Sequence, residues 1–345
     1  MNPPAIPVVD TREQLLHLLA EAAEFEHNLL CCYLYAAFSL KTDGGEGLTA
    51  QETATVKRWH EVIMSVAVEE MTHLILVANL TAAIGGRPHF NRPNLPVAPG
   101  HHPADFVVEL APFDMDTLDH FIFFERPEGT AIRDSDGFEP ETDYVRGARR
   151  GAGLMPSAHD YTSIAEFYGS IRSGFRRLTR LMGENVLFVG DSQSQIGPDM
   201  ARMDGLRTID SLDSALAAID TIIVQGEGAH SQSDDSHFAR FQEIKEEYEL
   251  LLEKNAAFVA ARPAARNPVM RKPADSAERV HVDSPQAAAT LDLANALYNH
   301  LLRLLSQSFG RTRHDDATKK QLIDAAVETM SVFAAVSAHL TTQPA

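Results

Sequence analysis

Cysteine is scarce in this chain of 345 residues, which contains only Cys31 and Cys32. Two neighbours in an expected helix cannot form a relaxed disulfide with each other, and the chain has no cysteine pair at zinc-site spacing. The composition therefore excludes a disulfide framework. We expect a reducing compartment, and hence a cytoplasmic protein.

Positive charge is also under-represented. Lys and Arg number 30 against 48 Asp and Glu, which gives a formal net charge of −18. A chain this acidic is a poor partner for phosphate backbones and anionic lipid headgroups, because both carry negative charge. We therefore expect no nucleic-acid partner.

Long hydrophobic runs are missing as well. The longest apolar-rich segment, around 74–84, is too short to span a bilayer. The first residues, MNPPAIPVVDTREQ, have neither the basic nor the apolar region of a signal peptide. Because apolar residues still make up 44% of the chain, we expect a globular protein with a sizeable core and no membrane partner.

The sequence does contain a long helical pattern, clearest between Trp59 and Leu80. One stripe steps by four and three residues through Trp59, Ile63, Val66, Glu70, His73, Val77 and Leu80. Glu70 and His73 interrupt an otherwise apolar face, and a buried carboxylate needs a proton, a cationic partner or a metal. The two interpretations are a metal site and a buried hydrogen bond between His and Glu.

A second stripe with the same feature lies in a helix expected from Thr11 to about Leu40. Thr11 and Gln14 predict a capping box at its start. The stripe consists of Leu15, Leu19, Ala22, Glu26, Leu29, Tyr33 and Ala37. Glu26 thus occupies a position where an aliphatic side chain is expected. With the next helix, at about 49–84, this one forms an antiparallel pair, which is half of a four-helix bundle.

The remaining chain is also predicted to be mainly helical. Further helices are expected at 113–125, 163–183, 211–225, from about 236, 285–309 and 316–340. Long inserted loops are expected within 85–115 and 126–162. Since no sustained strand alternation is present, the predicted fold class is all-α: a decorated bundle over 11–262 and a C-terminal helical hairpin over 280–341, packed on the bundle.

Inward polar residues on three expected helices form a candidate metal site. These residues are Glu26, the Glu70–His73 unit, and Glu227 at the end of the 211–225 helix. Their carboxylates and imidazole are ligands suited to two iron or manganese ions. In a dry core without a cation, these carboxylates would repel one another and their pKa values would have to rise. A two-metal site is therefore favoured over purely structural carboxylates.

Two positions of the ligand set stay open. A further carboxylate is sought at Glu166, but Ser163 and Glu166 also form a capping box, which would turn this carboxylate back toward the helix start. The second imidazole is either His230, which completes Glu-x-x-His with Glu227, or His237 on an apolar stripe. Because the glycines flanking Glu227 oppose a continuous helix, His237 is preferred.

Three further residues lie near these candidate ligands in the sequence. Tyr33 can donate a hydrogen bond to a ligand or carry a radical, as the candidate catalytic residue, or it can be a core tyrosine. Glu69 and His27 directly neighbour inward ligands on their helices. Helical geometry turns such neighbours away, so we expect both to face solvent.

Seven segments together give the chain a resemblance to a known family. They are EHNLLCCYLYAAFSLK, VEEMTHL, IGGRPHFNRPNLP, LDHFIFFERPE, IAEFYGSI, IIVQGEGAH and SHFARF. In this order they resemble the ferritin-like family that includes the C-terminal part of the iminophenyl-pyruvate dimer synthases of bisindole pigment biosynthesis. The likeness runs from about Thr11 to Phe258. It implies a ferritin-like four-helix bundle with the di-iron ligands Glu26, Glu70, His73, Glu166, Glu227 and His237.

Residues and resemblance together predict a di-iron oxidoreductase. Two iron ions, with manganese as the alternative metal, would activate O₂ or peroxide and oxidise a small organic substrate, aromatic or derived from an amino acid. Two other classes stay open: an iron-binding ferroxidase without an organic substrate, and a non-catalytic scaffold. A homodimer is compatible with each of them.

Overall fold

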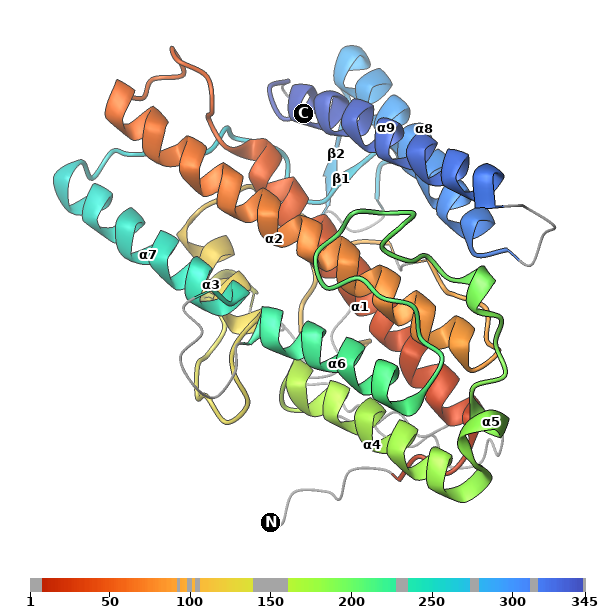
Figure 1. Cartoon of the computed structure of the whole chain (residues 1–345). Coiled ribbons are helices and arrows are strands. Elements are labelled where there is room, and N and C mark those ends of the chain that lie inside the picture. Colours follow the sequence, from red (N-terminus) through yellow and green to blue (C-terminus); the bar gives the residue numbers. More distant parts are fainter. Residues whose placement is uncertain are drawn as a thin grey trace.

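Two long helices, α1 (Arg12–Ser39) and α2 (Ala50–Ala83), form the backbone of the fold (Figure 1). The computed structural model describes residues 8–91, 94–97, 101–102, 106–138, 161–227, 235–273, 279–310 and 316–343. Both helices begin with capping boxes, Thr11 with Gln14 and Thr49 with Glu52, which satisfy N–H groups of the first turn. They pack along each other as the antiparallel pair that their stripes predict.

Four shorter helices complete the bundle. α4 (Ile164–Met182) and α6 (Leu212–Gly226) pack on one half of the α1–α2 pair, and α3 (Met115–Phe124) and α7 (His237–Lys254) pack on the other half (Figure 1). The other two long helices of an ideal four-helix bundle are thus replaced here by four short ones. The ends of these short helices meet near the middle of the bundle.

The apolar core is divided at the same level. On α2, residues 56–67 belong to a cluster rich in phenylalanine, shared with α3 and α7, while residues 74–84 belong to a second cluster, shared with α4 and α6. Between the two clusters lie Glu26 on α1 and Glu70 and His73 on α2, each at most 2% exposed. A polar layer in this position costs free energy unless its charges are compensated.

The C-terminal part forms a helical hairpin of α8 (Pro285–Ser308) and α9 (Asp316–Leu340), which packs beside α1 (Figure 1). The rings of Phe38 and Phe333 are 6.4 Å apart, and Thr341 donates a hydrogen bond of 2.8 Å to the carbonyl of Phe38. The connection from the bundle carries a parallel pair of two-residue strands, β1 (Pro268–Val269) and β2 (Val280–His281).

By length and composition alone, α9 is apolar enough to cross a membrane, with a mean hydropathy of 1.2 in its most apolar window. In the structure it packs against α8 and is also joined to the bundle through Lys319, which is 4% exposed. The ammonium group of Lys319 donates to the backbone carbonyls of Gln193 and Gln195.

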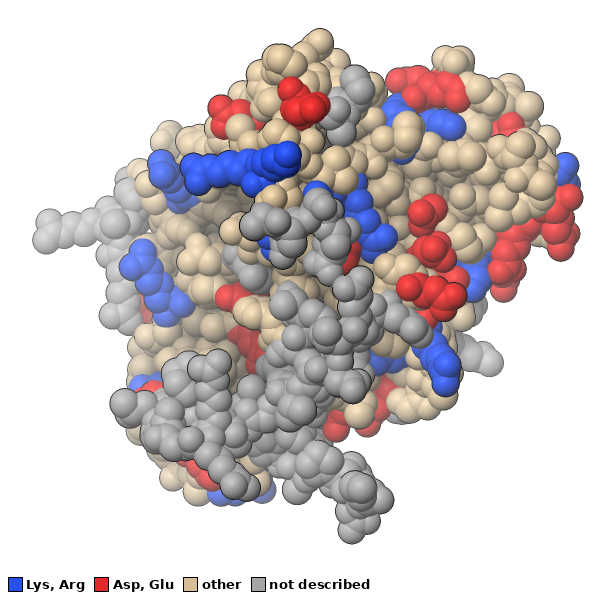
Figure 2. Space-filling view, turned by 180° about the vertical axis from the view of Figure 1, so that it is seen from behind, with Lys and Arg blue, Asp and Glu red and all other residues tan. Residues whose placement is uncertain are grey.

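The all-α prediction is confirmed, and the main helices begin and end within a few residues of their predicted bounds. Short elements in the connections were not predicted: α5 (Glu184–Leu187), two 3₁₀ turns (Asp136–Phe138 and Ser192–Ser194) and the strand pair. On the face shown in Figure 2, the charged side chains of the described residues lie in small separate groups, acidic and basic, divided by uncharged surface. The division into a bundle and a packed hairpin as separate domains stays a prediction.

Candidate metal centre

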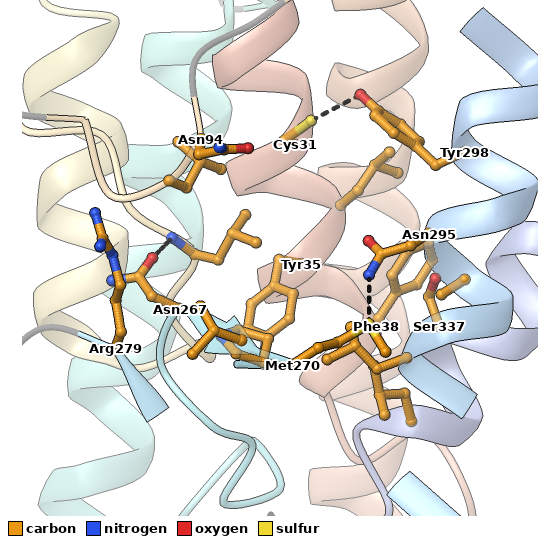
Figure 3. Close-up of a pocket in the computed structure, with 18 of the residues that line it drawn as sticks. Cys31, Tyr35, Phe38, Asn94, Asn267, Met270, Arg279, Asn295, Tyr298 and Ser337 are labelled. Atoms are coloured by element: carbon orange, nitrogen blue, oxygen red, sulfur yellow. Dashed lines mark hydrogen bonds between the residues drawn. The ribbon is translucent and has the colours of Figure 1, made fainter. Parts of the chain in front are cut away.

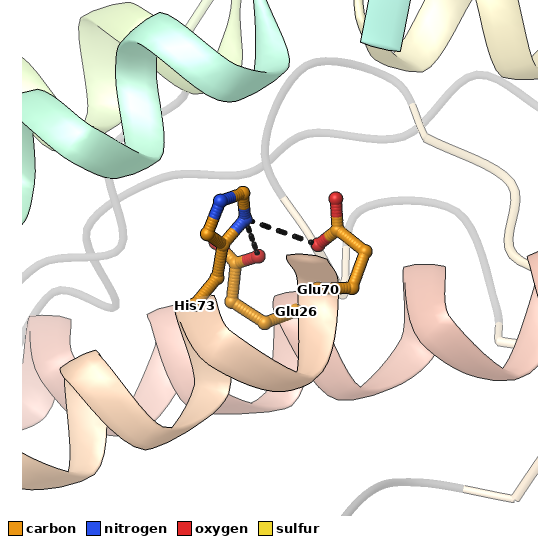
Figure 4. A group of neighbouring side chains, drawn as sticks. All are labelled: Glu26, Glu70 and His73. Atoms are coloured by element: carbon orange, nitrogen blue, oxygen red, sulfur yellow. Dashed lines mark ion pairs between the residues drawn. The ribbon is translucent and has the colours of Figure 1, made fainter. Parts of the chain in front are cut away.

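Five buried side chains with metal-ligand chemistry form two overlapping groups in the polar layer. The first is Glu26, Glu70 and His73 (Figure 4), and the second is Glu70, Glu125 and His237. Within each group, one potential ligand atom per residue lies within 4.8 Å of the others. Glu70 belongs to both groups, so its two oxygens lie where a carboxylate can bridge two ions.

The first group is built from the two long helices. Nδ1 of His73 lies 3.4 Å from an oxygen of Glu26 and 3.4 Å from an oxygen of Glu70. The other ring nitrogen, Nε2, lies 2.9 Å from the side-chain oxygen of Gln225. Because that oxygen is an acceptor, it favours a proton on Nε2 and leaves Nδ1 free to act as a ligand.

The second group is built from the ends of two short helices. Glu125 follows the last residue of α3, and His237 is the first residue of α7, where Ser236 caps the helix. Nδ1 of His237 lies 2.9 Å from Glu70 and 3.5 Å from Glu125, and Nε2 lies 3.1 Å from Glu69. Both imidazoles thus turn Nδ1 toward the carboxylates and Nε2 toward an outer acceptor.

The ionisation of the layer reflects crowded charges in a dry environment. Burial, together with the nearby carboxylate of Glu70, raises the pKa of Glu26 to about 8. Burial alone would lower the pKa of His73, but Glu70 and Glu26 raise it to about 10. Burial opposes ionisation of Glu70 too, yet His73 and His237 hold its pKa below the usual range. Without a metal ion, protons on the imidazoles compensate the carboxylates.

Some buried polar atoms of this layer have no hydrogen bond to a described residue, and their chemistry shows whether a metal ion would fit here. Oε2 of Glu70 and Nδ1 of His237 are buried, and neither forms a hydrogen bond of acceptable geometry with a described residue, although Nδ1 of His237 lies 2.9 Å from Oε1 of Glu70. Orphaned buried atoms of this kind are costly. Oε2 of Glu70 lies on the side of the first group, 3.4 Å from Nδ1 of His73, and Nδ1 of His237 lies on the side of the second. Carboxylate oxygens and imidazole nitrogens are also the donor types that iron and manganese accept. The residues therefore fit a pair of such ions.

Two tyrosines hold the outer carboxylates. Tyr168 on α4 donates a hydrogen bond to Glu26, and Tyr33 on α1 donates one of 2.5 Å to Glu125. Burial and the adjacent glutamates raise the pKa of both phenols well above the ordinary value, so both stay protonated donors. Tyr33 was a candidate from the sequence; Tyr168 was not.

The other predicted ligands lie outside the two groups. The carboxylate of Glu166 turns back toward the helix start, but it accepts hydrogen bonds of 2.7 Å from the backbone and hydroxyl of Thr162, one residue before the N-cap Ser163 with which the capping box was predicted. Glu227 caps the end of α6 and accepts from the backbone N–H groups of Glu128 and Ala165. Burial raises its pKa to about 7. His230 lies outside the described residues.

Glu125 is the functional candidate that the sequence analysis missed. It occupies the position in the polar layer for which Glu166 was proposed. A signal was present, because Leu118, Phe121 and Glu125 step by three and four residues, the pattern that identified Glu26 and Glu70. The position of Glu125 at a helix end, directly after a run of phenylalanines, concealed the stripe.

The expectation that Glu69 and His27 face solvent is wrong. Glu69 accepts from His237 and from Arg240, so the carboxylate beside the ligand stripe orients a candidate ligand on another helix. His27 is 1% exposed, and its Nε2 meets the hydroxyl of Tyr298 on α8. Both errors arose because neighbouring helices cover faces that an isolated helix would expose.

Comparison with known proteins identifies the family. A profile of the ferritin-like family matches residues 19–246, which is more than half of the chain. A solved ferritin-like protein from Caulobacter vibrioides has a similar fold, with a TM-score of 0.61, 19% identity and coverage of 98% of this chain and 97% of that one.

Two curated relatives match almost the whole chain. Dichlorochromopyrrolate synthase of Lentzea aerocolonigenes is 29% identical over 94% of this chain, and 2-imino-3-(indol-3-yl)propanoate dimerase of Chromobacterium violaceum is 25% identical over 95%. The chain spans only 34% and 32% of the lengths of these relatives. Given the family match and the all-α bundle around a layer of carboxylates and imidazoles, the chain belongs to the ferritin-like family.

Proposed function

We propose that the polar layer holds two iron ions, with manganese as the alternative metal, and that the loaded protein uses O₂ or peroxide to oxidise a small organic molecule. The observation that carries this proposal is the pair of buried groups joined by Glu70. Glu26 and His73 would hold one ion, Glu125 and His237 the other, and Glu70 would bridge them. When bound, the iron supplies a redox centre that exchanges electrons with oxidant and substrate.

The remaining residues of the site orient the ligands. Gln225 and Glu69 hold the outer nitrogens of the two imidazoles, which sets the tautomer that a ligand needs. Tyr168 and Tyr33 hold one oxygen each of Glu26 and Glu125. Glu227 is an outer carboxylate in this arrangement, and burial together with the charge of Glu125 raises its own pKa.

The side of α1 next to Glu26 offers a place for the substrate to approach. His102, from the connection between α2 and α3, packs edge-on against Phe25, with ring centroids 5.6 Å apart, and pairs with Asn28 at 2.7 Å. Nδ1 of His102 and Oδ1 of Asn28 are buried without a hydrogen-bond partner among the described residues. Burial lowers the pKa of His102 to about 3, so it stays neutral. A polar group of the substrate would satisfy these atoms.

The relatives support an organic substrate rather than iron storage. The names of both relatives describe enzymes that make or join small molecules, and one of them acts, by its name, on the imino acid 2-imino-3-(indol-3-yl)propanoate. Because the chain spans about a third of each relative, we carry over only the class: an aromatic compound derived from an amino acid.

The test combines metal content with oxygen consumption. Metal-free protein is loaded with Fe²⁺ under argon, freed of excess iron and analysed; we expect about two ions per chain. O₂ uptake is then followed with and without the indolyl imine, using Glu70→Leu as the control. Uptake over many turnovers that requires both the imine and Glu70 supports an oxidase.

Two outcomes would overturn this function. Uptake limited to the bound iron, with no product from the imine or from other aromatic imines, would indicate a ferroxidase. Iron content near zero in folded protein would indicate a scaffold. The absorption spectrum after exposure to air gives an independent record of iron oxidation in either case.

A further inference from the structure

A cleft of about 630 Å³ separates α1 from the C-terminal hairpin (Figure 3). Its α1 wall includes Cys31, Tyr35 and Phe38, whereas Glu26 and Tyr33 belong to the metal centre. With 3.6 residues per turn, Tyr35 lies about half a turn around α1 from Tyr33. None of the five candidate metal ligands lines the cleft. It is therefore a separate space, with α1 as the shared wall.

The walls suit an apolar molecule of moderate size. They are formed by aromatic and aliphatic side chains from α1, α8, α9 and two connections: Leu34, Tyr35, Phe38, Leu95, Leu110, Leu291, Tyr298, Phe333 and Leu340. The volume falls within the range of roughly 300–1,000 Å³ that is typical of small-molecule sites. The cleft is therefore large enough for a two- or three-ring compound.

The polar side chains among these walls differ in how firmly they are paired. Asn295 on α8 donates from its side-chain nitrogen to the sulfur of Met270 at 3.5 Å (Figure 3). A thioether is a weak acceptor, so this amide can turn to a better partner at little cost. The hydroxyl of Tyr298 is already engaged, because it pairs with Nε2 of His27 and lies 3.1 Å from the sulfur of Cys31. The amide of Asn295 is therefore a donor that can orient a ligand without making the cleft polar.

Among the described residues that line the cleft, the charged side chains are all cationic: Arg271, Lys272 and Arg279. None of these three cations forms an ion pair or a side-chain hydrogen bond with another described residue. The whole chain carries a net charge of −18, so three neighbouring cations stand out against its composition. A cluster of this kind attracts and orients an anionic group.

We propose that this cleft is a binding site for an amphipathic organic anion. Its ring or alkyl body lies between α1 and the α8–α9 hairpin, and its carboxylate, sulfonate or phosphate group meets Arg271, Lys272 and Arg279. The proposal does not rest on the proposed function, because it requires neither a metal nor a reaction. The C-terminal helices, which the sequence predicts to pack on the bundle as a hairpin, form one side of this site.

A pair of fluorescent probes tests both halves of the proposal. 8-Anilinonaphthalene-1-sulfonate and N-phenyl-1-naphthylamine share an aromatic body, and only the first carries an anionic group. Titration of the folded, metal-free full chain should show one site for the sulfonate, with weaker binding of the neutral amine. Added salt should weaken the binding of the sulfonate and leave the binding of the amine nearly unchanged, because salt screens interactions between charges. Iron loading should change neither.

Variants then assign the site. Replacing Arg271, Lys272 and Arg279 together by Gln should lower the affinity for the sulfonate by about tenfold or more, because charge-assisted hydrogen bonds are lost. The affinity for the neutral amine should change by less than about twofold. Ser337→Trp, which places a large side chain in the cleft, should weaken both probes. Lys57→Gln with Arg303→Gln, two exposed cations away from the cleft, is the matched control.

Circular dichroism of each variant confirms that it is folded. If the triple Gln variant binds the sulfonate as tightly as the parent protein, the cations do not form the site and the proposal is overturned. The same follows if Ser337→Trp leaves the binding of both probes unchanged. Neither result bears on iron content or oxygen uptake, so the proposed function is tested separately.

Discussion

The two groups of the metal centre share Glu70 but differ in how the chain supports them. Glu26, Glu70 and His73 lie within continuous turns of α1 and α2, whose packing along each other sets their separation. Glu125 and His237 lie at the ends of α3 and α7, and their position depends on where those short helices dock. The first group is therefore preorganised by secondary structure, and the second by tertiary packing.

This difference has a mechanical consequence. A helix interior resists displacement because each residue is held by hydrogen bonds on both sides, whereas helix ends open at lower free energy. We expect the ion held by Glu125 and His237 to be the more readily lost of the two. The following predictions test this asymmetry, beginning with the largest expected effect.

Loss of Glu70 should abolish both ion positions, because both groups share it. In Glu70→Leu we expect metal content to fall from about two ions per chain to near zero. Removing a buried carboxylate should leave the metal-free protein as stable as the parent, or more so, and the rise in melting temperature on metal addition should vanish. Elemental analysis and thermal unfolding with and without metal measure both. A drop of several degrees in metal-free Glu70→Leu would mean that Glu70 holds the bundle through protein contacts.

Loss of one imidazole should remove one ion. His237→Ala should lower metal content from about two ions to about one, whereas His230→Ala should leave it nearly unchanged. Elemental analysis of both variants, loaded in parallel, gives the answer. Should His230→Ala lose the ion instead, α6 would have to continue through the glycines around Glu227, and the break between α6 and α7 would be misplaced.

The two candidate carboxylates of the third helix give a matched pair. Glu125→Ala should lose the ion of the second group, while Glu166→Ala should keep both ions and lose only a little stability, because Ser163 remains as the N-cap of α4. Metal titration and chemical denaturation separate the two effects. Equal loss of metal in both variants would place Glu166 at the centre as well.

The smallest effect concerns pH. A raised pKa favours the protonated form in the folded state, so the stabilising contribution is present at low pH and is lost as pH rises through the folded pKa. For Glu26 this loss takes place between its ordinary pKa of 4.5 and its folded-state pKa of about 8. For His73 it takes place between pKa values of 6.5 and about 10. The metal-free protein should therefore become less stable between pH 6 and pH 9.

Metal reverses this trend because it binds the deprotonated ligands. The increase in melting temperature on addition of Mn²⁺ should be larger at pH 8.5 than at pH 6. Thermal unfolding at both pH values, with Glu70→Leu as the variant without a metal increment, checks the sign. If the metal-induced increase in melting temperature shrinks at higher pH, the metal does not displace protons from the imidazoles and Glu26.

The sequence by itself determined the helices and the first group. Periodicity identifies positions on one helix, and Glu26, Glu70 and His73 interrupt apolar stripes long enough to be read without any partner. The capping boxes at Thr11 and Thr49 set where the two long helices begin. These features are local, so the order of residues is sufficient to predict them.

Only the tertiary structure decided the second group and the environment of both. His237 was preferred from its apolar stripe, but Glu125, more than a hundred residues away and at a helix end, where periodicity is lost, was not identified. Whether Glu166 turns to its own helix start or to the bundle centre depends on packing. Packing also decides that Glu69 contacts His237 and that His27 is buried. Local propensity fixes which face a side chain occupies, but the free energy of burying that face depends on the partner element that covers it.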